Sequence, residues 1–179
     1  MRKLRNLLMP VLLSAVILLM TGCGQKLESW AYDYEPTEET IAFYKNGQAV
    51  YKGEKYSYVK DDSFITLTNE AGEKKLRYEK NGDSLVLYEK STYKSVGERT
   101  EGSIVGTWSQ DNGWSFVFTD AGEFAEENIF FGHYSIDSEN SRIKLMYDDP
   151  VPDIYLYYTL SGDELTIDYP WPMTATKKS

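Results

Sequence analysis

The chain has 179 residues with 15% aromatic and 26% charged residues, a formal net charge of -9 and a pI near 4.7. This acidic excess disfavours nucleic acid and anionic lipid surfaces as partners, because both carry negative charge. The single cysteine and the single histidine exclude a disulfide framework and thiolate-rich or histidine-rich metal sites.

The N-terminus carries a targeting signal. Three basic residues (Arg2, Lys3, Arg5) precede an apolar stretch at 7–20, which ends in LLMTGC at Cys23. A transmembrane helix needs about 20 apolar residues, and this stretch is shorter and interrupted by proline. A secreted protein with a free thiol is the other alternative, but such a thiol is a liability outside the cytoplasm.

With its small residues before the cysteine, this pattern resembles the lipobox of bacterial lipoproteins. The resemblance implies that residues 1–22 are a signal peptide and that Cys23 carries a covalent diacylglyceryl lipid, the only attached group we expect. Two acyl chains suffice for stable anchoring. The expected location is therefore the extracytoplasmic face of the cell membrane, with residues 23–29 as the acylated N-terminus and a short spacer.

The mature chain repeats itself. We predict a first β unit at 30–88, a polar linker at 89–103 without periodicity, and a second β unit at 104–179. Five landmarks recur in the same order at offsets of 75 to 80 residues: Trp30 and Trp108, IAFYKNG and FVFTDAG, YSY and YSI, ITL and IKL, and YEKNGDSLVL and YTLSGDELTI.

Each unit is predicted to be all-β. Apolar and polar residues alternate with period two at 116–118, 143–145, 154–158 and 165–167, which is typical of strands buried on one face. NG, AG and GD pairs between these runs indicate hairpin turns. Five or six short strands per unit would form an antiparallel meander, with one short helix starting at 36–40 (PTEET). Two small barrels are favoured over one larger barrel by the polar linker.

The motif VGTW at 105–108 resembles the GxW opening of lipocalins, and more closely that of small lipocalin-like domains of unassigned function on Gram-positive lipoproteins. The resemblance implies that Trp108 packs across the closed end of a barrel and that Gly106 permits a backbone bend there. The first unit has Trp30 but Glu28 in place of the glycine. Each unit is about half as long as a lipocalin barrel, so either each closes into a small filled barrel or both join in a larger one.

No catalytic constellation is evident. The sequence lacks a GxSxG elbow and a phosphate loop, and it has no Ser-x-x-Lys motif with recognisable partners. His133 is interpreted as an ordinary strand or turn residue. The acidic pairs at 61–62, 126–127 and 148–149 lack the alternating spacing of a calcium loop. We therefore expect no enzymatic activity, no catalytic residue and no metal site.

Aromatic residues are the strongest functional candidates. Tyr155, Tyr157 and Trp171 have the chemistry of a binding surface for a peptide, glycan or lipid, with core packing as the alternative role. The prolines on both sides of Trp171 are expected to keep it out of a central strand. The sequence thus predicts a membrane-anchored lipoprotein with a non-enzymatic binding role toward an envelope protein or glycan. The alternative is a carrier or sensor of a small hydrophobic ligand held in a barrel cavity.

Overall fold

The computed structural model describes residues 24–176, which form an antiparallel meander of fourteen strands. Each strand pairs with the next one along the chain, which confirms the all-β prediction. The strands are β1 (Lys26–Tyr32), β2 (Ile41–Tyr44), β3 (Gln48–Tyr51), β4 (Glu54–Lys60), β5 (Phe64–Asn69), β6 (Gly72–Asn81), β7 (Ser84–Val96), β8 (Gly106–Ser109), β9 (Ser115–Phe118), β10 (Glu123–Glu126), β11 (Phe130–Asp137), β12 (Arg142–Tyr147), β13 (Ile154–Ser161) and β14 (Glu164–Ala175).

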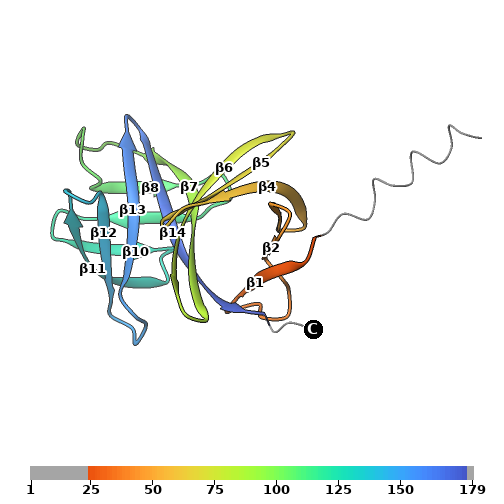
Figure 1. The fold of residues 1–179 in the computed structure, drawn as a ribbon. Helices are drawn as coiled ribbons and strands as arrows, with labels where there is room; N and C mark the ends of the chain where they lie inside the picture. The colour runs from red at the N-terminus through yellow and green to blue at the C-terminus, as the bar shows by residue number, and fades with distance from the viewer. Residues whose placement is uncertain (1–23, 177–179) are drawn as a thin grey trace, which may run out of the picture.

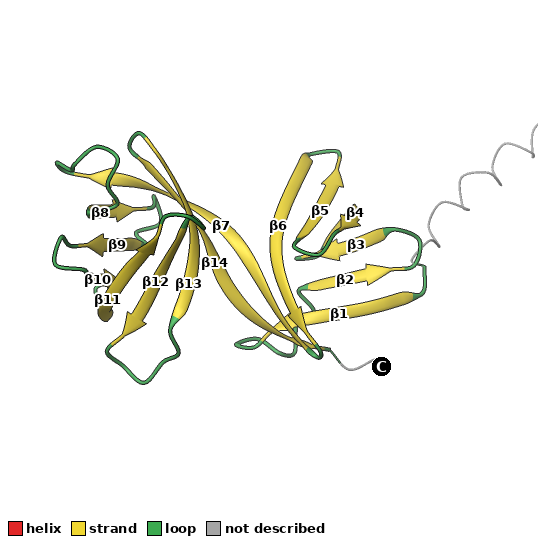
Figure 2. Ribbon diagram, turned by 60° about the vertical axis from the view of Figure 1, so that its left-hand side comes forward, coloured by secondary structure: helices red, strands yellow, loops and turns green. Residues whose placement is uncertain are grey.

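The sheet closes into a ring of strands, and two strands from opposite sides of this ring also pair with each other. β1 pairs with both β2 and β14, which closes the ring of strands. The long strands β7 and β14 also pair with each other along eleven residue pairs, from Glu164 with Lys94 to Thr174 with Ser84. This β7–β14 ribbon divides the ring into a first barrel containing β1–β6 and a second containing β8–β13 (Figure 1). Figure 2 shows both long strands crossing from one barrel to the other.

The predicted linker at 89–103 is wrong in its first part, because those residues belong to the β7–β14 ribbon. Residues 89–96 belong to β7, and its last three residues pair with β8, so only 97–105 connect β7 to β8 outside a strand. The segment EKSTYKSV is polar because one of its faces is exposed, and it still alternates, with Tyr93 buried next to exposed Lys94. Seven strands precede the connector at 97–105 and seven follow it, rather than five or six on each side.

The prediction that its flanking prolines exclude Trp171 from a central strand is wrong. Pro170 and Pro172 lie inside β14 and face Tyr88 and Val86 of β7. They are tolerated because β14 changes partners here: its last pair with β13 is at Asp168 and its first with β1 is at Met173. Residues 169–172 thus have a neighbouring strand on one side only, and a proline without an N–H is compatible with such a local edge.

Each barrel encloses its own cluster of buried side chains. The first is centred on Trp30, Ile41 and Leu87, and the second on Trp108, Phe116 and Ile167. Trp108 is fully buried and its Nε1 donates a hydrogen bond of 2.7 Å to the carbonyl of Ile104. The burial follows the period-two pattern of the sequence, as in β12, where Ile143 and Leu145 are buried between partly exposed neighbours.

Two other expectations concern single segments. Residues 36–38 form a turn and a bend rather than a helix, with the Glu38 N–H bonded to the Glu35 carbonyl at 3.2 Å. The hairpins predicted at 46–47, 71–72, 81–82, 121–122 and 162–163 all join consecutive strands. Within residues 24–176 no helix is long and apolar enough to cross a membrane. Residues 1–22 and Cys23 lie outside the described part of the chain.

Candidate functional site

A groove of about 540 Å³ lies where the two barrels meet. One wall comes from the turn after β1, another from the start of β13, and the floor from the β7–β14 ribbon. Its lining is dominated by aromatic and proline residues: Asp33, Tyr34, Val86, Tyr88, Pro152, Asp153, Ile154, Tyr155, Tyr169, Pro170, Trp171 and Pro172. This volume is in the usual range for small-molecule sites.

Three aromatic rings of the groove, those of Tyr34, Trp171 and Tyr169, form a connected row. Trp171 lies at the centre, 5.6 Å from the ring of Tyr34 and 5.2 Å from that of Tyr169. Tyr34 also stacks on Tyr32 at 5.0 Å with nearly parallel planes. Such contacts contribute about 0.5–1.5 kcal/mol each beyond burial and restrict the orientation of the rings. The groove therefore has a connected aromatic wall rather than isolated exposed rings.

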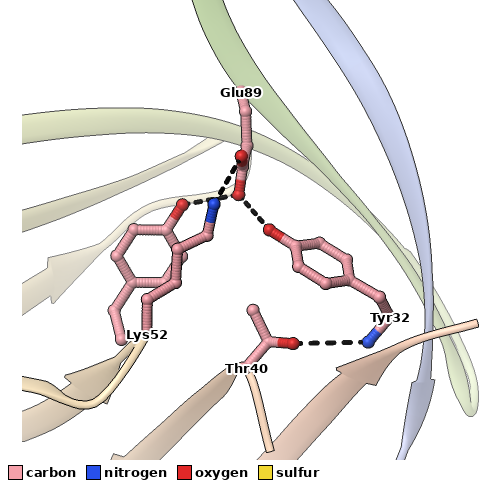
Figure 3. Close-up of polar contacts among 5 residues, drawn as sticks. Tyr32, Thr40, Lys52 and Glu89 are labelled. Atoms are coloured by element: carbon pink, nitrogen blue, oxygen red, sulfur yellow. Dashed lines mark hydrogen bonds and ion pairs between the residues drawn. The ribbon is translucent and has the colours of Figure 1, made fainter. Parts of the chain in front are cut away.

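A half-buried carboxylate supports this wall on the side of the first barrel. Glu89 of β7 accepts hydrogen bonds from the hydroxyls of Tyr32 and Tyr51, the latter at 2.6 Å, and pairs with Lys52 at 2.8 Å (Figure 3). Lys52 stands in the two-residue hairpin between β3 and β4, where a positive φ of 49° is followed by Gly53 at 81°. This tight turn places the ammonium group over the carboxylate.

The charge of Glu89 is compensated locally. Burial alone would raise its pKa, but the hydrogen bonds and charge of Lys52, Tyr32 and Tyr51 outweigh burial, so the pKa of Glu89 is lowered. Burial and the bond to Glu89 raise the pKa of both tyrosines. Glu89 therefore remains ionised and its two tyrosines neutral at physiological pH, which keeps the donors and the acceptor of this cluster matched.

A second carboxylate, which is buried, supports the other end of the wall. Glu126, the last residue of β10, is only 4% exposed and accepts a hydrogen bond of 2.8 Å from the Tyr147 hydroxyl. Tyr169 of the groove also interacts with this carboxylate. The next residue is Glu127, in the place that Lys52 has after Tyr51. Each of the two clusters thus contains one carboxylate and two tyrosines, but only the first also contains a cation.

Because of this difference, the pKa of Glu126 is shifted in the opposite direction to that of Glu89. Burial raises the pKa of Glu126, the bonds from Tyr147 and Tyr169 oppose the shift, and the charge of Glu127 adds to it. Among residues 24–176, no lysine or arginine forms an ion pair with Glu126. Ionised Glu126 is therefore destabilised relative to its protonated form, in contrast to Glu89.

The structure brings two of the three predicted binding residues together. Trp171 and Tyr155 both line the groove, and Tyr155 is 43% exposed. Tyr157 lies outside it, under the guanidinium of Arg77 at 3.9 Å and against the ring of Tyr88 at 5.3 Å. Tyr157 therefore supports Tyr88, which is a lining residue.

The predicted motif residues lie at the barrels rather than at the groove. Trp108 is buried under Arg99, whose guanidinium carbon is 5.1 Å from the ring, and Gly106 has a φ of 139°. Trp30 is likewise covered by a cation, Lys80 at 5.0 Å. Glu28, which replaces the glycine of the motif, forms ion pairs with Lys80 and Lys60.

Sequence reasoning missed the supporting residues of the wall. Tyr32, Tyr51, Lys52 and Glu89 lie on three strands and a turn that are distant in sequence, and the predicted linker contains Glu89. Only the alternation within EKSTYKSV indicates that Glu89 belongs to a strand. Tyr34 was also missed, although its 65% exposure makes it the most accessible ring of the groove.

The groove offers contact surfaces rather than reactive groups. Among the residues that the structure describes, its only charged groups are the carboxylates of Asp33 and Asp153. Within the described range 24–176, no three histidine, cysteine, aspartate or glutamate residues are placed to hold a metal ion. His133 is exposed on β11, opposite Glu123 and Met146. No protein-family model matches the chain, and neither curated proteins nor solved structures gave a significant match.

Proposed function

We propose that this protein is a lipoprotein anchored through Cys23 to the extracytoplasmic face of the cell membrane, where it binds a ligand or partner without catalysing a reaction. The groove between the barrels is the proposed binding site. The carrying observation is its connected aromatic wall, held from behind by Glu89 and reached from solvent through Tyr34 and Tyr155.

We also propose that the two halves are copies of one lipocalin-like unit. Corresponding strands have closely similar burial: β3 and β10 share the same order of exposed, buried and half-buried residues, and β5 and β12 differ at one position only. The lipobox pattern supports the anchor. The groove lies on the ribbon that both units contribute, so a single copy would lack it.

A second candidate function is a carrier that holds a small hydrophobic molecule inside a barrel. Its motivation is the GxW motif and the closed form of each barrel. The barrel interiors, however, contain large side chains such as Trp108, Phe116 and Phe118, which are at most 1% exposed. Interior space occupied by side chains favours the groove over the barrels as the ligand site.

Fractionation of cells tests the anchor. The wild type is expected in the membrane fraction, whereas Cys23→Ala is expected to be soluble or mislocalised because it lacks the acceptor for the lipid. Membrane association of Cys23→Ala at the wild-type level would overturn the lipoprotein proposal.

Site-specific photocross-linking in intact cells tests the groove. A photoreactive residue at Tyr155 is expected to give a discrete adduct. The same residue at Trp114, which is 45% exposed but outside the groove, is the matched control. Equal labelling from both positions, or none from Tyr155, would contradict a binding role of the groove.

A further inference from the structure

We propose that the groove binds an organic cation of the quaternary ammonium class, with the aromatic wall around Trp171 receiving its alkylated nitrogen and Asp33 balancing its charge. This inference rests on the proposed function and specifies the ligand class of the same site. It follows from the residues that line the groove, from the missing N–H donors of its two prolines and from the bonding partners of Asp33.

The lining is complementary to an alkylated cation. It is rich in aromatic rings and prolines, and among residues 24–176 its charged residues are two aspartates, with no lysine, arginine or histidine. Aromatic faces attract a cation within about 6 Å through the negative potential of the ring. The methyl groups of a quaternary ammonium are themselves apolar, so such a cation gains contact with the rings and loses little hydration.

The two prolines of the floor reinforce this preference. Residues 169–172 have a strand neighbour on one side only, and the nitrogens of Pro170 and Pro172 carry no hydrogen. A peptide adding a strand at this edge would find few N–H donors. An anionic ligand would meet the same shortage together with the aspartates. Both features favour a ligand that needs no donors from the protein.

Asp33 supplies a negative charge with which no lysine or arginine of the described residues pairs. Its Oδ1 accepts a hydrogen bond of 2.6 Å from the Thr174 hydroxyl, and among residues 24–176 it forms no ion pair. Asp153 differs, because it pairs with Lys144 at 2.8 Å. Arg142 and Lys144 lie 5.1 and 6.0 Å from the ring of Tyr155, so the rings left for a ligand cation are those around Trp171.

The test is an NMR titration of the full-length protein in a neutral maltoside detergent, with nitrogen-15 in its tryptophans. Choline is the probe and 3,3-dimethyl-1-butanol, its uncharged isostere, is the control ligand. We expect choline to shift the indole signal of Trp171 saturably, leave that of Trp114 in place, and bind about tenfold more tightly than the isostere.

Two variants locate the interaction. Asp33→Asn keeps an oxygen that accepts from Thr174 and is expected to weaken choline binding about three- to fivefold. Binding to Trp171→Leu, which lacks the reporting indole, is followed through the N-methyl proton signal of choline and is expected to be at least tenfold weaker. Trp114→Leu is expected to leave choline binding unchanged. Unchanged indole signals of Trp30 and Trp108 in each variant show that both barrels remain folded.

Equal or tighter binding of the isostere would overturn the cation inference and leave the groove as an apolar binding site. The cation inference is equally wrong if Asp33→Asn and Trp171→Leu bind choline like the wild type. If neither compound shifts Trp171, the inference also fails, while the cross-linking at Tyr155 decides separately whether the groove has a partner.

Discussion

The two glutamates that support the aromatic wall are expected to respond to pH in opposite directions. Glu89 is bonded to Lys52 and two tyrosines, and Glu126 to tyrosines alone with Glu127 nearby. Replacement by glutamine removes the charge of each while keeping an acceptor oxygen for the tyrosine hydroxyls. The isosteric variants Glu89→Gln and Glu126→Gln therefore isolate the contribution of charge.

Glu89→Gln is expected to destabilise the fold at neutral pH. Hydrogen bonds to charged groups contribute about 1.5–3 kcal/mol. Because the side chain of Lys52 is 49% exposed and that of Glu89 is 19% exposed, solvent screens their ion pair. We therefore expect a loss of about 1–2 kcal/mol in the free energy of unfolding, which lowers the Tm by about 3–6 °C for a domain of this size.

The sign of the pH dependence follows from proton linkage. The pKa of Glu89 is lower in the folded than in the unfolded protein, so its stabilisation is present above the unfolded value of about 4.3 and is lost as pH falls through the folded value. The Tm gap between wild type and Glu89→Gln should therefore be constant from about pH 8 to pH 5 and close below about pH 4.

Glu126→Gln is expected to do the reverse. With a folded pKa above the unfolded one, the ionised carboxylate destabilises the fold at neutral pH, and this cost disappears as pH falls toward about 4.3. The variant should be more stable than the wild type by about 1 kcal/mol at pH 7.5, in keeping with the cost of an incompletely compensated buried polar group. Its advantage should vanish near pH 4.

Thermal unfolding of both variants and the wild type, followed by circular dichroism from pH 3 to pH 8, measures these differences. Carboxylates remote from both sites titrate alike in all three proteins, so their contributions cancel in the comparison. Two variants with Tm shifts of the same sign at pH 7.5, or a Glu89→Gln gap that persists unchanged at pH 3, would refute the assignment of opposite electrostatic roles.

Two further predictions concern the packing of the second barrel. Gly132→Ala should lower the free energy of unfolding by about 2–3 kcal/mol, since a Cβ there would lie 2.1 Å from the Met146 carbonyl oxygen on the neighbouring strand. Urea titration measures this loss. The control is Ser135→Ala at an exposed position of the same strand, which is expected to leave the free energy of unfolding nearly unchanged. Trp108→Phe should cost about 2–4 kcal/mol, because it leaves a cavity and an unpaired Ile104 carbonyl; a loss below about 1 kcal/mol would show that this hydrogen bond and the filled space contribute little.

The strands could be predicted where one face is buried by apolar residues. β12 and β14 follow the alternation of Ile143, Leu145, Leu165 and Ile167, and the turns follow Gly at positions such as Gly47, with a φ of 78°. These signals are local, so they are readable in one sequence. β7 beyond Tyr88 was missed because its exposed face is charged and its partner β14 lies far away in the sequence.

The groove could be predicted only in part. Trp171 and Tyr155 are candidates because of their chemistry, and the structure places both in the lining. Their arrangement depends on the pairing of Tyr169 with Glu89 across the ribbon and on the turn that brings Tyr34 to Trp171. These contacts are long-range consequences of closing two barrels on shared strands, and no spacing in the sequence encodes them.

The most direct test of the account is native mass spectrometry of the full-length protein, extracted from the membranes of its own host and compared with its denatured mass. A binding site in the groove predicts a mass excess beyond the covalent lipid that is lost on denaturation, absent from Trp171→Leu and retained by Trp114→Leu. An excess that Trp171→Leu keeps would place the ligand inside a barrel instead, and a wild-type protein without any excess would contradict a resident ligand in the groove.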